Sequence, residues 1–279
     1  VMSEHILRDQ TNGLRLRYQK NPNSLLWITT GDGELIGLTF EGEQEVFAWH
    51  RHILGGTDPV VESIAAIPSS TGTVDELWMV VKRTVNSATV RYVERLLPDF
   101  NPSSTTDKDE MKFVDSMLSG DASSTTVYGL NHLEGEELQV VVDGDYVGDK
   151  TVSNGTITLD ATGTTGIAGL KYTSKIKTLP VAPRGDFGAA GGGIKALPRI
   201  MVNLLNSIGF KHGRVDTDLW QEDFRGMGDD MDQSPALFTG WKDVNLEAKH
   251  DRDGQFWIVQ DQPFPLNVMG LVTVVEASE

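Results

Sequence analysis

The sequence predicts an all-β fold. Short runs of β-branched and aromatic residues recur along the chain, and turn-forming groups such as Gly31-Asp32-Gly33 and Asn154-Gly155 separate them. Helical signals are scarce, so about a dozen short strands with little helix predict antiparallel sheets. The 279 residues include 10 Phe, 6 Trp and 5 Tyr, which is enough apolar material for a packed core.

Residues 1–100 predict consecutive hairpins. The first has arms at Leu25–Thr30 and Glu34–Phe40, and Glu45–His50 follows it as a further strand. Val60–Ile67 ends at Pro68, and a later hairpin joins Leu77–Arg83 to Thr89–Leu96 through residues 85–88. We therefore expect residues 1–100 to form one β-sheet domain.

A Ser/Thr/Pro-rich stretch at residues 97–126 is the best domain boundary. Within it, Asp107–Leu118 fits either a short helix or a strand that begins at Met111. Beyond it, Asp143-Gly144 and Asn154-Gly155 lie in two successive hairpins that predict a small antiparallel sheet or barrel. We place this domain at 101–182, with Leu170–Leu179 as its last strand.

The remaining residues, 183–279, form the third predicted segment. Gly185–Gly193 is typical of a linker, and Ile194–Ile208 fits either a helix or a strand, although Pro198 argues against a helix interior. Later strands are predicted at Val244–Lys249, Gln255–Gln260 and Leu266–Val275. We expect these strands to return to the main body.

Composition excludes several classes of function. The chain has no Cys, which excludes a disulfide framework, a cysteine nucleophile and a thiolate metal site. No stretch approaches 18 apolar residues, so no membrane anchor is expected. The first five residues lack the basic and apolar regions of a signal peptide, so none is expected there.

The net charge is −16, and its distribution is uneven. Residues 101–150 carry −8 and residues 216–232 carry −6, whereas residues 151–215 carry +6. An excess of carboxylates repels nucleic-acid phosphates over most of the surface. The acidic blocks Asp107–Asp149 and Asp216–Asp232 are either solvated loops or a polarised face, and the basic stretch Lys171–Arg214 could meet an acidic neighbour.

No motif supplies a catalytic constellation. His50 and His52 could share a strand face as metal ligands, but no third ligand follows, and a strand end with polar contacts is the better interpretation. Asp143-Gly144-Asp145 and Asp251-x-Asp253-Gly254 fit hairpin turns better than calcium loops, and Asp229-Asp230-x-Asp232 fits an acidic loop. The glycines at 185–193 lack the ending of a phosphate-binding loop, so no cofactor is expected.

An ordered set of blocks resembles the tail nozzle proteins of short-tailed bacteriophages, also called tail tubular protein B or tail stabilisation proteins. The blocks are SLLWITTGDGELIGLTF (24–40), EQEVFAWHRH (43–52), ESIAAIP (62–68), DELWMVVKR (75–83), VRYVERL (90–96), GLNHLEG (129–135), GLKYTSKIKTL (169–179) and QDQPFPL (260–266). The resemblance covers most of the chain in order.

The resemblance implies a propeller-like ring of β blades with an additional small antiparallel β domain, assembled as a homohexamer around the DNA ejection channel of the virion tail. It implies assembly in the host cytoplasm, contacts with portal, adaptor and tail tip, needle or fibre proteins, passage of DNA without tight binding, and no catalysis. Residues 1–100 hold about two blades, whereas propellers have 4–8. We therefore expect a C-terminal piece of a longer protein, or a reduced family member.

Ten carboxylates are candidates for lining the channel or an interface, because an acidic surface does not hold DNA. They are Asp143, Asp145, Asp149, Asp216, Asp218, Glu222, Asp223, Asp229, Asp230 and Asp232. Two alternative functions stay open. One is a receptor- or carbohydrate-binding module that uses Trp220, Trp241 or Trp257 for stacking, and the other is an envelope polysaccharide hydrolase.

Overall fold

The computed structural model describes residues 4–7, 14–100, 111–181, 184–185, 188–189, 194–226, 228, 235–247 and 250–277. Nearly every regular element in these ranges is a strand. The exceptions are the four-residue helix α1 (Glu4–Leu7) and the short turns η1 (Gly42–Gln44) and η3 (Asn131–Leu133). The prediction of an all-β fold is therefore confirmed.

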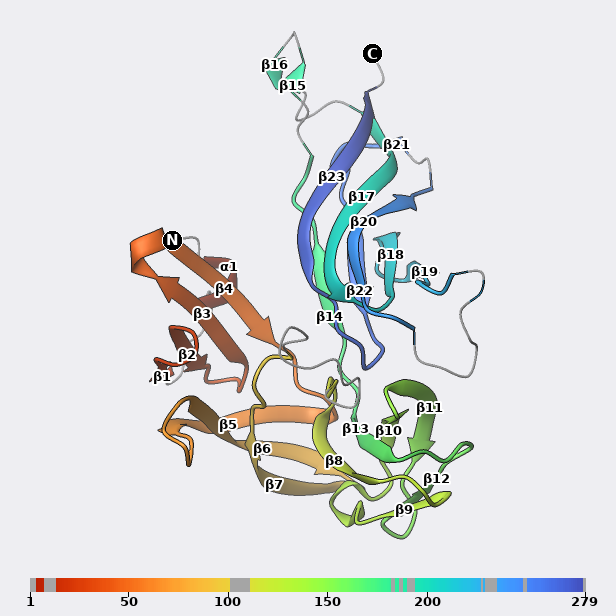
Figure 1. The fold of residues 1–279 in the computed structure, drawn as a ribbon. Coiled ribbons are helices and arrows are strands. Elements are labelled where there is room, and N and C mark those ends of the chain that lie inside the picture. Colours follow the sequence, from red (N-terminus) through yellow and green to blue (C-terminus); the bar gives the residue numbers. More distant parts are fainter. Residues whose placement is uncertain are drawn as a thin grey trace.

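Seven sheets account for the described strands, every pairing is antiparallel, and none of the sheets in the described ranges is closed. The sheets group into units that follow one another along the chain, as the colours of Figure 1 show. The first two lie together, the third and fourth form a small unit beside them, and the last three lie above that small unit in the view.

The first sheet is a meander of four strands in chain order. Its strands are β1 (Arg15–Gln19), β2 (Leu25–Thr29), β3 (Leu35–Glu41) and β4 (Val46–His52). Thr29 lies opposite Leu35 across the predicted first hairpin, and Gly33 has a φ of 87°, a conformation that glycine adopts without a steric penalty.

The second sheet has three strands in chain order, β5 (Thr57–Pro68), β6 (Asp75–Val85) and β7 (Ala88–Arg95). The β6–β7 turn places Asn86 and Ser87 at φ 46° and 61°, as a type I′ turn requires. One face of this sheet packs against the first sheet, and their shared core includes Trp27, Leu35 and Val81.

The small unit combines two sheets around one core. The larger sheet has the order β11 (Asp145–Thr151), β10 (Glu137–Val142), β13 (Thr165–Leu170), β8 (Asp115–Asp121), and the smaller pairs β12 (Thr156–Thr158) with β9 (Thr126–Tyr128). The undecided segment 107–118 thus contains the start of a strand at Asp115, while residues 101–110 lie outside the described ranges.

The last unit contains three sheets. One has the order β14 (Ser174–Lys177), β22 (Trp257–Gln260), β18 (Phe210–Val215), β19 (Asp218–Glu222). Another places β17 (Lys195–Ser207) between β20 (Phe238–Asn245) and β23 (Val268–Ala277), with β21 (His250–Asp251) at one end. A two-stranded sheet joins β15 (Arg184–Gly185) to β16 (Gly188–Ala189).

Two sequence predictions need correction or completion in this unit. Leu170–Leu179 is not one strand, because β13 ends at Leu170 and β14 pairs with β22 in a different sheet. Ile194–Ile208 is a strand, and Pro198 is accommodated because the pairing shifts register between Ala196 and Arg199. The Pro198 carbonyl accepts a hydrogen bond from the Leu246 N–H at 2.9 Å.

Candidate functional site

The first group of predicted carboxylates lies on and beside β11. Asp143 is a turn residue with a φ of 47°, and its carboxylate accepts hydrogen bonds from the backbone N–H groups of Thr164 at 2.9 Å and Thr165 at 2.8 Å. Asp149 accepts a hydrogen bond from the Tyr146 hydroxyl at 2.5 Å and lies 3.2 Å from the Lys171 ammonium. Asp143 therefore holds a turn together, as the hairpin interpretation predicts.

The second group lies on and around β19. Asp216 pairs with Lys175 at 3.4 Å, and Glu222 pairs with Lys242 at 3.2 Å. Asp218 and Asp223 form no carboxylate ion pair with another described residue, although the Asp223 carbonyl accepts a hydrogen bond from Lys242. Asp229, Asp230 and Asp232 lie outside the described residues.

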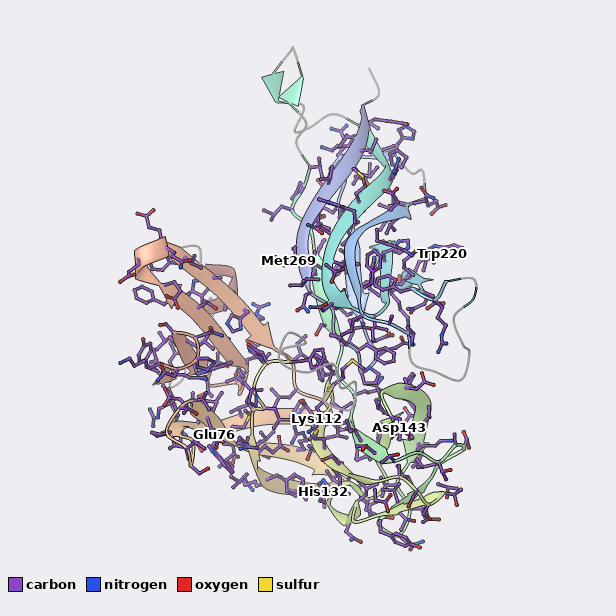
Figure 2. The ribbon with its side chains drawn as sticks, in the orientation of Figure 1. Glu76, Lys112, His132, Asp143, Trp220 and Met269 are labelled. Carbon is purple, nitrogen blue, oxygen red and sulfur yellow. The ribbon has the colours of Figure 1, made fainter. Side chains whose placement is uncertain are left out.

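One ion pair brings the two acidic groups together. Asp145 of β11 lies 3.7 Å from the Arg225 guanidinium, which follows β19 in the chain. Because β11 belongs to the small unit and β19 to the last unit, the pair joins two units, on which Figure 2 labels Asp143 and Trp220, respectively. The backbone carbonyl of Asp261 strengthens this junction by accepting a hydrogen bond from the Gln139 amide at 2.6 Å.

The basic stretch Lys171–Arg214 finds acidic partners within the same chain. Lys175 pairs with Asp216, Lys211 with Asp261 at 2.5 Å, and Arg214 with Asp251 at 2.5 Å. Asp216 belongs to an acidic block, whereas Asp261 and Asp251 lie outside both blocks. A contact of this stretch with an acidic neighbouring subunit stays a prediction.

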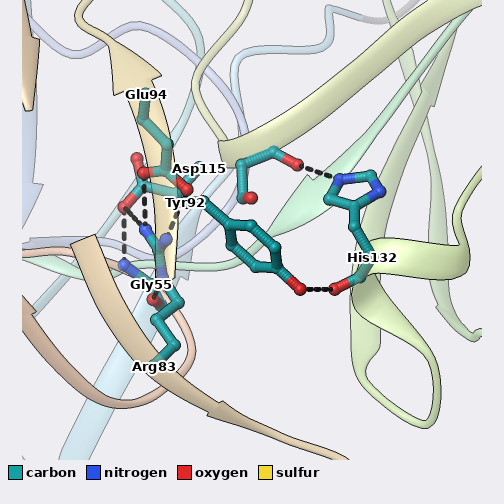
Figure 3. Close-up of polar contacts among 7 residues, drawn as sticks. Gly55, Arg83, Tyr92, Glu94, Asp115 and His132 are labelled. Atoms are coloured by element: carbon teal, nitrogen blue, oxygen red, sulfur yellow. Dashed lines mark hydrogen bonds and ion pairs between the residues drawn. The ribbon is translucent and has the colours of Figure 1, made fainter. Parts of the chain in front are cut away.

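A buried arginine that sequence reasoning missed forms the junction between the second sheet and the small unit (Figure 3). The Arg83 side chain is fully buried, donates a hydrogen bond from Nε to the Gly55 carbonyl at 2.9 Å, and forms a two-point ion pair with Glu94. Its Nη2 also lies 4.0 Å from Asp115 of β8. The sequence could have indicated this burial, because Arg83 occupies a position in the alternation of β6 at which the other residues, Leu77, Met79, Val81 and Val85, are buried and apolar.

Asp115 completes this junction. Its carboxylate accepts a hydrogen bond from the Gly55 N–H at 2.6 Å. Burial raises the pKa of Asp115 to about 6, and the Gly55 hydrogen bond and Arg83 oppose this rise. Nearby, the Tyr92 hydroxyl donates to the His132 carbonyl at 2.6 Å, and His132 contacts the Ser116 carbonyl through Nε2 at 3.1 Å (Figure 3). Hydrogen bonds and ion pairs therefore hold the small unit against the second sheet.

The two histidines considered as metal ligands contact each other. Nδ1 of His50 lies 2.8 Å from Nε2 of His52, and both rings pack against Trp27. Burial lowers the pKa of His52 to about 4, and the neighbouring His50 also contributes to this lowering. Polar contacts at a strand end, the interpretation favoured from the sequence, describe this pair. Among the described residues, no group of three or more His, Asp or Glu is placed to hold a metal ion.

The first sheet is apolar on both faces. The second sheet covers one face. On the other, Ile6 of α1 packs against Ile28 and Ile36. Beyond that contact the register places further apolar residues on this outer face, with exposed fractions of 48% for Leu16, 55% for Tyr18, 44% for Phe40 and 46% for Phe47.

We call this surface the outer face of the first sheet. Phe40 and Phe47 pair across β3 and β4 with ring centroids 5.2 Å apart. Trp49 lies in the same face, and its Nε1 is buried without a hydrogen-bond partner in the described structure. A contiguous apolar face of this kind marks a contact surface.

The three tryptophans proposed for stacking differ in exposure. Trp220 on β19 is 68% exposed and Trp241 on β20 is 54% exposed, whereas Trp257 is half-buried with the Lys177 ammonium 5.3 Å from its ring centroid. Two indole side chains are therefore open to solvent.

Comparison with known proteins finds no protein-family model and no curated protein that matches the sequence. None of the helices in the described ranges is long and apolar enough to cross a membrane. The function is therefore inferred from the residues and their geometry.

Proposed function

We propose that the chain is a structural protein of the tail nozzle of a short-tailed bacteriophage. In this role it forms part of a homohexamer around the DNA ejection channel and contacts the portal, adaptor and tail-tip proteins in the virion. The outer face of the first sheet is the observation that carries the proposal. A four-stranded meander with apolar residues on both faces is suited to lie between two other sheets, as a blade does in a propeller.

The exposed aromatic rings on the outer face of the first sheet support the same role. The second sheet covers one face of this meander, whereas Phe40 and Phe47 on the opposite face remain about half exposed. A covering sheet would remove these rings from water. For this chain, we expect a second copy to supply that sheet.

The charge distribution is also compatible with a conduit. Phosphate contacts from Lys and Arg hold DNA without regard to sequence, and such contacts would slow its passage. Lys175, Lys211 and Lys242 are each engaged by a carboxylate of the same chain. Lining of the channel by Asp218, Asp223 and the other candidate carboxylates stays a prediction.

The test combines location and assembly. Antibodies raised against the chain should label the tails of purified virions in immunogold electron microscopy, and size-exclusion chromatography with negative-stain microscopy should reveal sixfold rings. Phe47→Ser should abolish the rings, while Trp220→Ser, which changes an exposed aromatic residue far along the chain, should leave them intact. Tails that the antibodies do not label would contradict the proposed function. Rings that survive Phe47→Ser would contradict the outer face of the first sheet as the interface between copies.

A carbohydrate-binding module is the second candidate, favoured by the exposed indoles of Trp220 and Trp241. Sugar rings stack on such side chains. Under this alternative the protein remains monomeric, host glycans quench its tryptophan fluorescence, and Trp220→Ser rather than Phe47→Ser removes the effect. The same two variants thus separate the two functions.

A further inference from the structure

The consecutive strands β8 and β9 do not pair with each other. β8 pairs with β13 and β9 pairs with β12, so in the described chain each strand has one edge without a neighbour. We call the opening between these two edges the β8–β9 seam. An unpaired edge presents backbone N–H and C=O groups at alternate residues, and another strand can bind them.

A cavity of about 410 Å³ opens in the β8–β9 seam. Its floor consists of the core residues Val140, Ile157, Leu159 and Ala168, each of which is at most 3% exposed. Its rim is polar and includes residues of both strands, among them Asp121 of β8 and Thr126 of β9. The seam is therefore an entrance to the apolar core of the small unit.

The glycine at position 120 leaves part of this space open, whereas a Cβ atom at Gly166 would meet the Ala122 Cβ at 3.0 Å. Gly120 of β8 lies directly opposite Gly166 of β13, and both line the cavity. Their neighbours in the next row of the same face, Leu118 and Ala168, belong to or pack against the core of the small unit. A Cβ atom added at Gly120 would meet no heavy atom within 4 Å, so the space is open.

The charge around the seam favours a cationic occupant. Residues 111–170 contain two lysines against nine carboxylates, a net charge of −7. On the rim, the Asp121 carboxylate accepts hydrogen bonds from the Ser123 N–H at 2.8 Å and its hydroxyl at 2.9 Å, and these bonds lower the pKa of Asp121. The rim therefore stays negatively charged near neutral pH.

We propose that the β8–β9 seam binds an extended segment of a basic partner protein, which adds to the edge of β8 as a further strand and inserts one large apolar side chain into the cavity. Backbone pairing would supply affinity, and the cavity and the negative charge would supply selectivity. A glycan fits less well, because the floor is apolar and the rim groups of Asp121 and Ser124 already bond to Ser123 and Thr126. This site is independent of the proposed tail role.

The test uses a fluorescein-labelled peptide of alternating Lys and Leu or Val, with the sequence KVKLKVKL, and the full chain. Fluorescence anisotropy should detect saturable binding that weakens with salt. Gly120→Phe fills the cavity and should weaken binding by about tenfold or more. Gly270→Phe is the matched control, because Gly270 is also a strand glycine with no atom within 4 Å of an added Cβ, and it lies on β23.

Two further peptides make the result specific. A Glu-containing counterpart, EVELEVEL, and a proline-interrupted one, KVKPKVKL, should bind at least about tenfold more weakly, since the first reverses the charge and the second loses a backbone donor. Hydrogen exchange should show protection of residues 117–128 in the complex. Equal affinity of Gly120→Phe and the wild type, absence of binding, or binding of an oligosaccharide that Gly120→Phe abolishes would overturn the proposal.

Discussion

Arg83 and Glu94 form a two-point ion pair between neighbouring strands of the second sheet, and water reaches none of the Arg83 side chain. The same guanidinium contacts Gly55 and approaches Asp115 of the small unit. A single buried cation thus joins the strand β6, the segment before β5 and the start of β8. The junction depends on charge geometry as well as on apolar packing.

We predict that Arg83→Leu lowers the free energy of unfolding by about 3–5 kcal/mol, because it leaves Glu94 without its partner in a largely buried place. Urea unfolding followed by tryptophan fluorescence measures the change. Arg91→Leu is the matched control, since Arg91 pairs with Glu62 in the same two-point geometry but is 57% exposed. Its loss should change stability little, and an equal effect of the two variants would contradict this assignment.

Ser87→Gly should stabilise the chain by about 0.5–1 kcal/mol. Ser87 occupies a φ of 61° in the β6–β7 turn, where a Cβ atom costs energy and glycine does not. Thermal unfolding measures the difference. Ala88→Gly, at the next position and within β7, should instead destabilise by a similar amount, because glycine loses more backbone entropy in a strand.

Asp143→Ala should destabilise the small unit by about 1–2 kcal/mol, since the carboxylate holds the N–H groups of Thr164 and Thr165. Asp218→Ala removes the same charge at an exposed position of β19 and should stay within about 0.5 kcal/mol of the wild type. Urea unfolding of both variants distinguishes a turn-forming carboxylate from a merely acidic one. Equal stability of the two would mean that the Asp143 bonds contribute nothing.

Acid should weaken the first sheet through His52. Burial holds the pKa of His52 at about 4, whereas an unfolded histidine titrates near its ordinary value of 6.5, so the unfolded state binds the proton first as the pH falls. The stabilisation is complete above pH 6.5 and is lost progressively down to about pH 4, on the order of 3 kcal/mol in all.

The slope of the unfolding free energy against pH tests this assignment. His52→Gln should flatten the slope between pH 6.5 and 4 whatever its effect on absolute stability, while the exposed His250 offers a control as His250→Gln.

Asp115 acts in the opposite sense. Its pKa is raised to about 6, so protonation below that value favours the folded state, and Asp115→Asn should steepen the loss of stability in acid.

Local chemistry made the hairpins of this chain predictable. Asp-Gly and Asn-Gly allow positive φ angles, and the structure places Asp143, Gly144, Asn154 and Gly155 at such angles. The two strands β18 and β19 were not predicted, because polar residues such as Lys211 and Arg214 interrupt their apolar pattern. Those polar residues are paired with Asp261 and Asp251 from distant parts of the chain, and no local pattern reports such partners.

The same limit applies to the candidate site. The ten carboxylates were chosen as acidic blocks, but a block in the sequence says nothing about the cations that folding brings beside it, as Lys175 is brought to Asp216. Arg83 could have been identified from its buried position in the alternation of β6, whereas Glu94 and Asp115 as its partners required the pairing of strands. The sequence showed the outer face of the first sheet only as an alternation of apolar residues. Whether such a face is exposed depends on which other elements cover it, and the alternation does not show that.

The arrangement of β17 sets an order in which the chain can fold during its synthesis. β17 (195–207) pairs along most of its length with β23 (268–277), and β14 (174–177) pairs with β22 (257–260). The last unit therefore cannot close until roughly 100 further residues, up to the end of β23, have left the ribosome after β14, whereas the meander of β1–β4 is complete once its own 38 residues, 15–52, have emerged. Until then the apolar side of β17 is exposed, and this unit should depend on chaperones more than the first two sheets do.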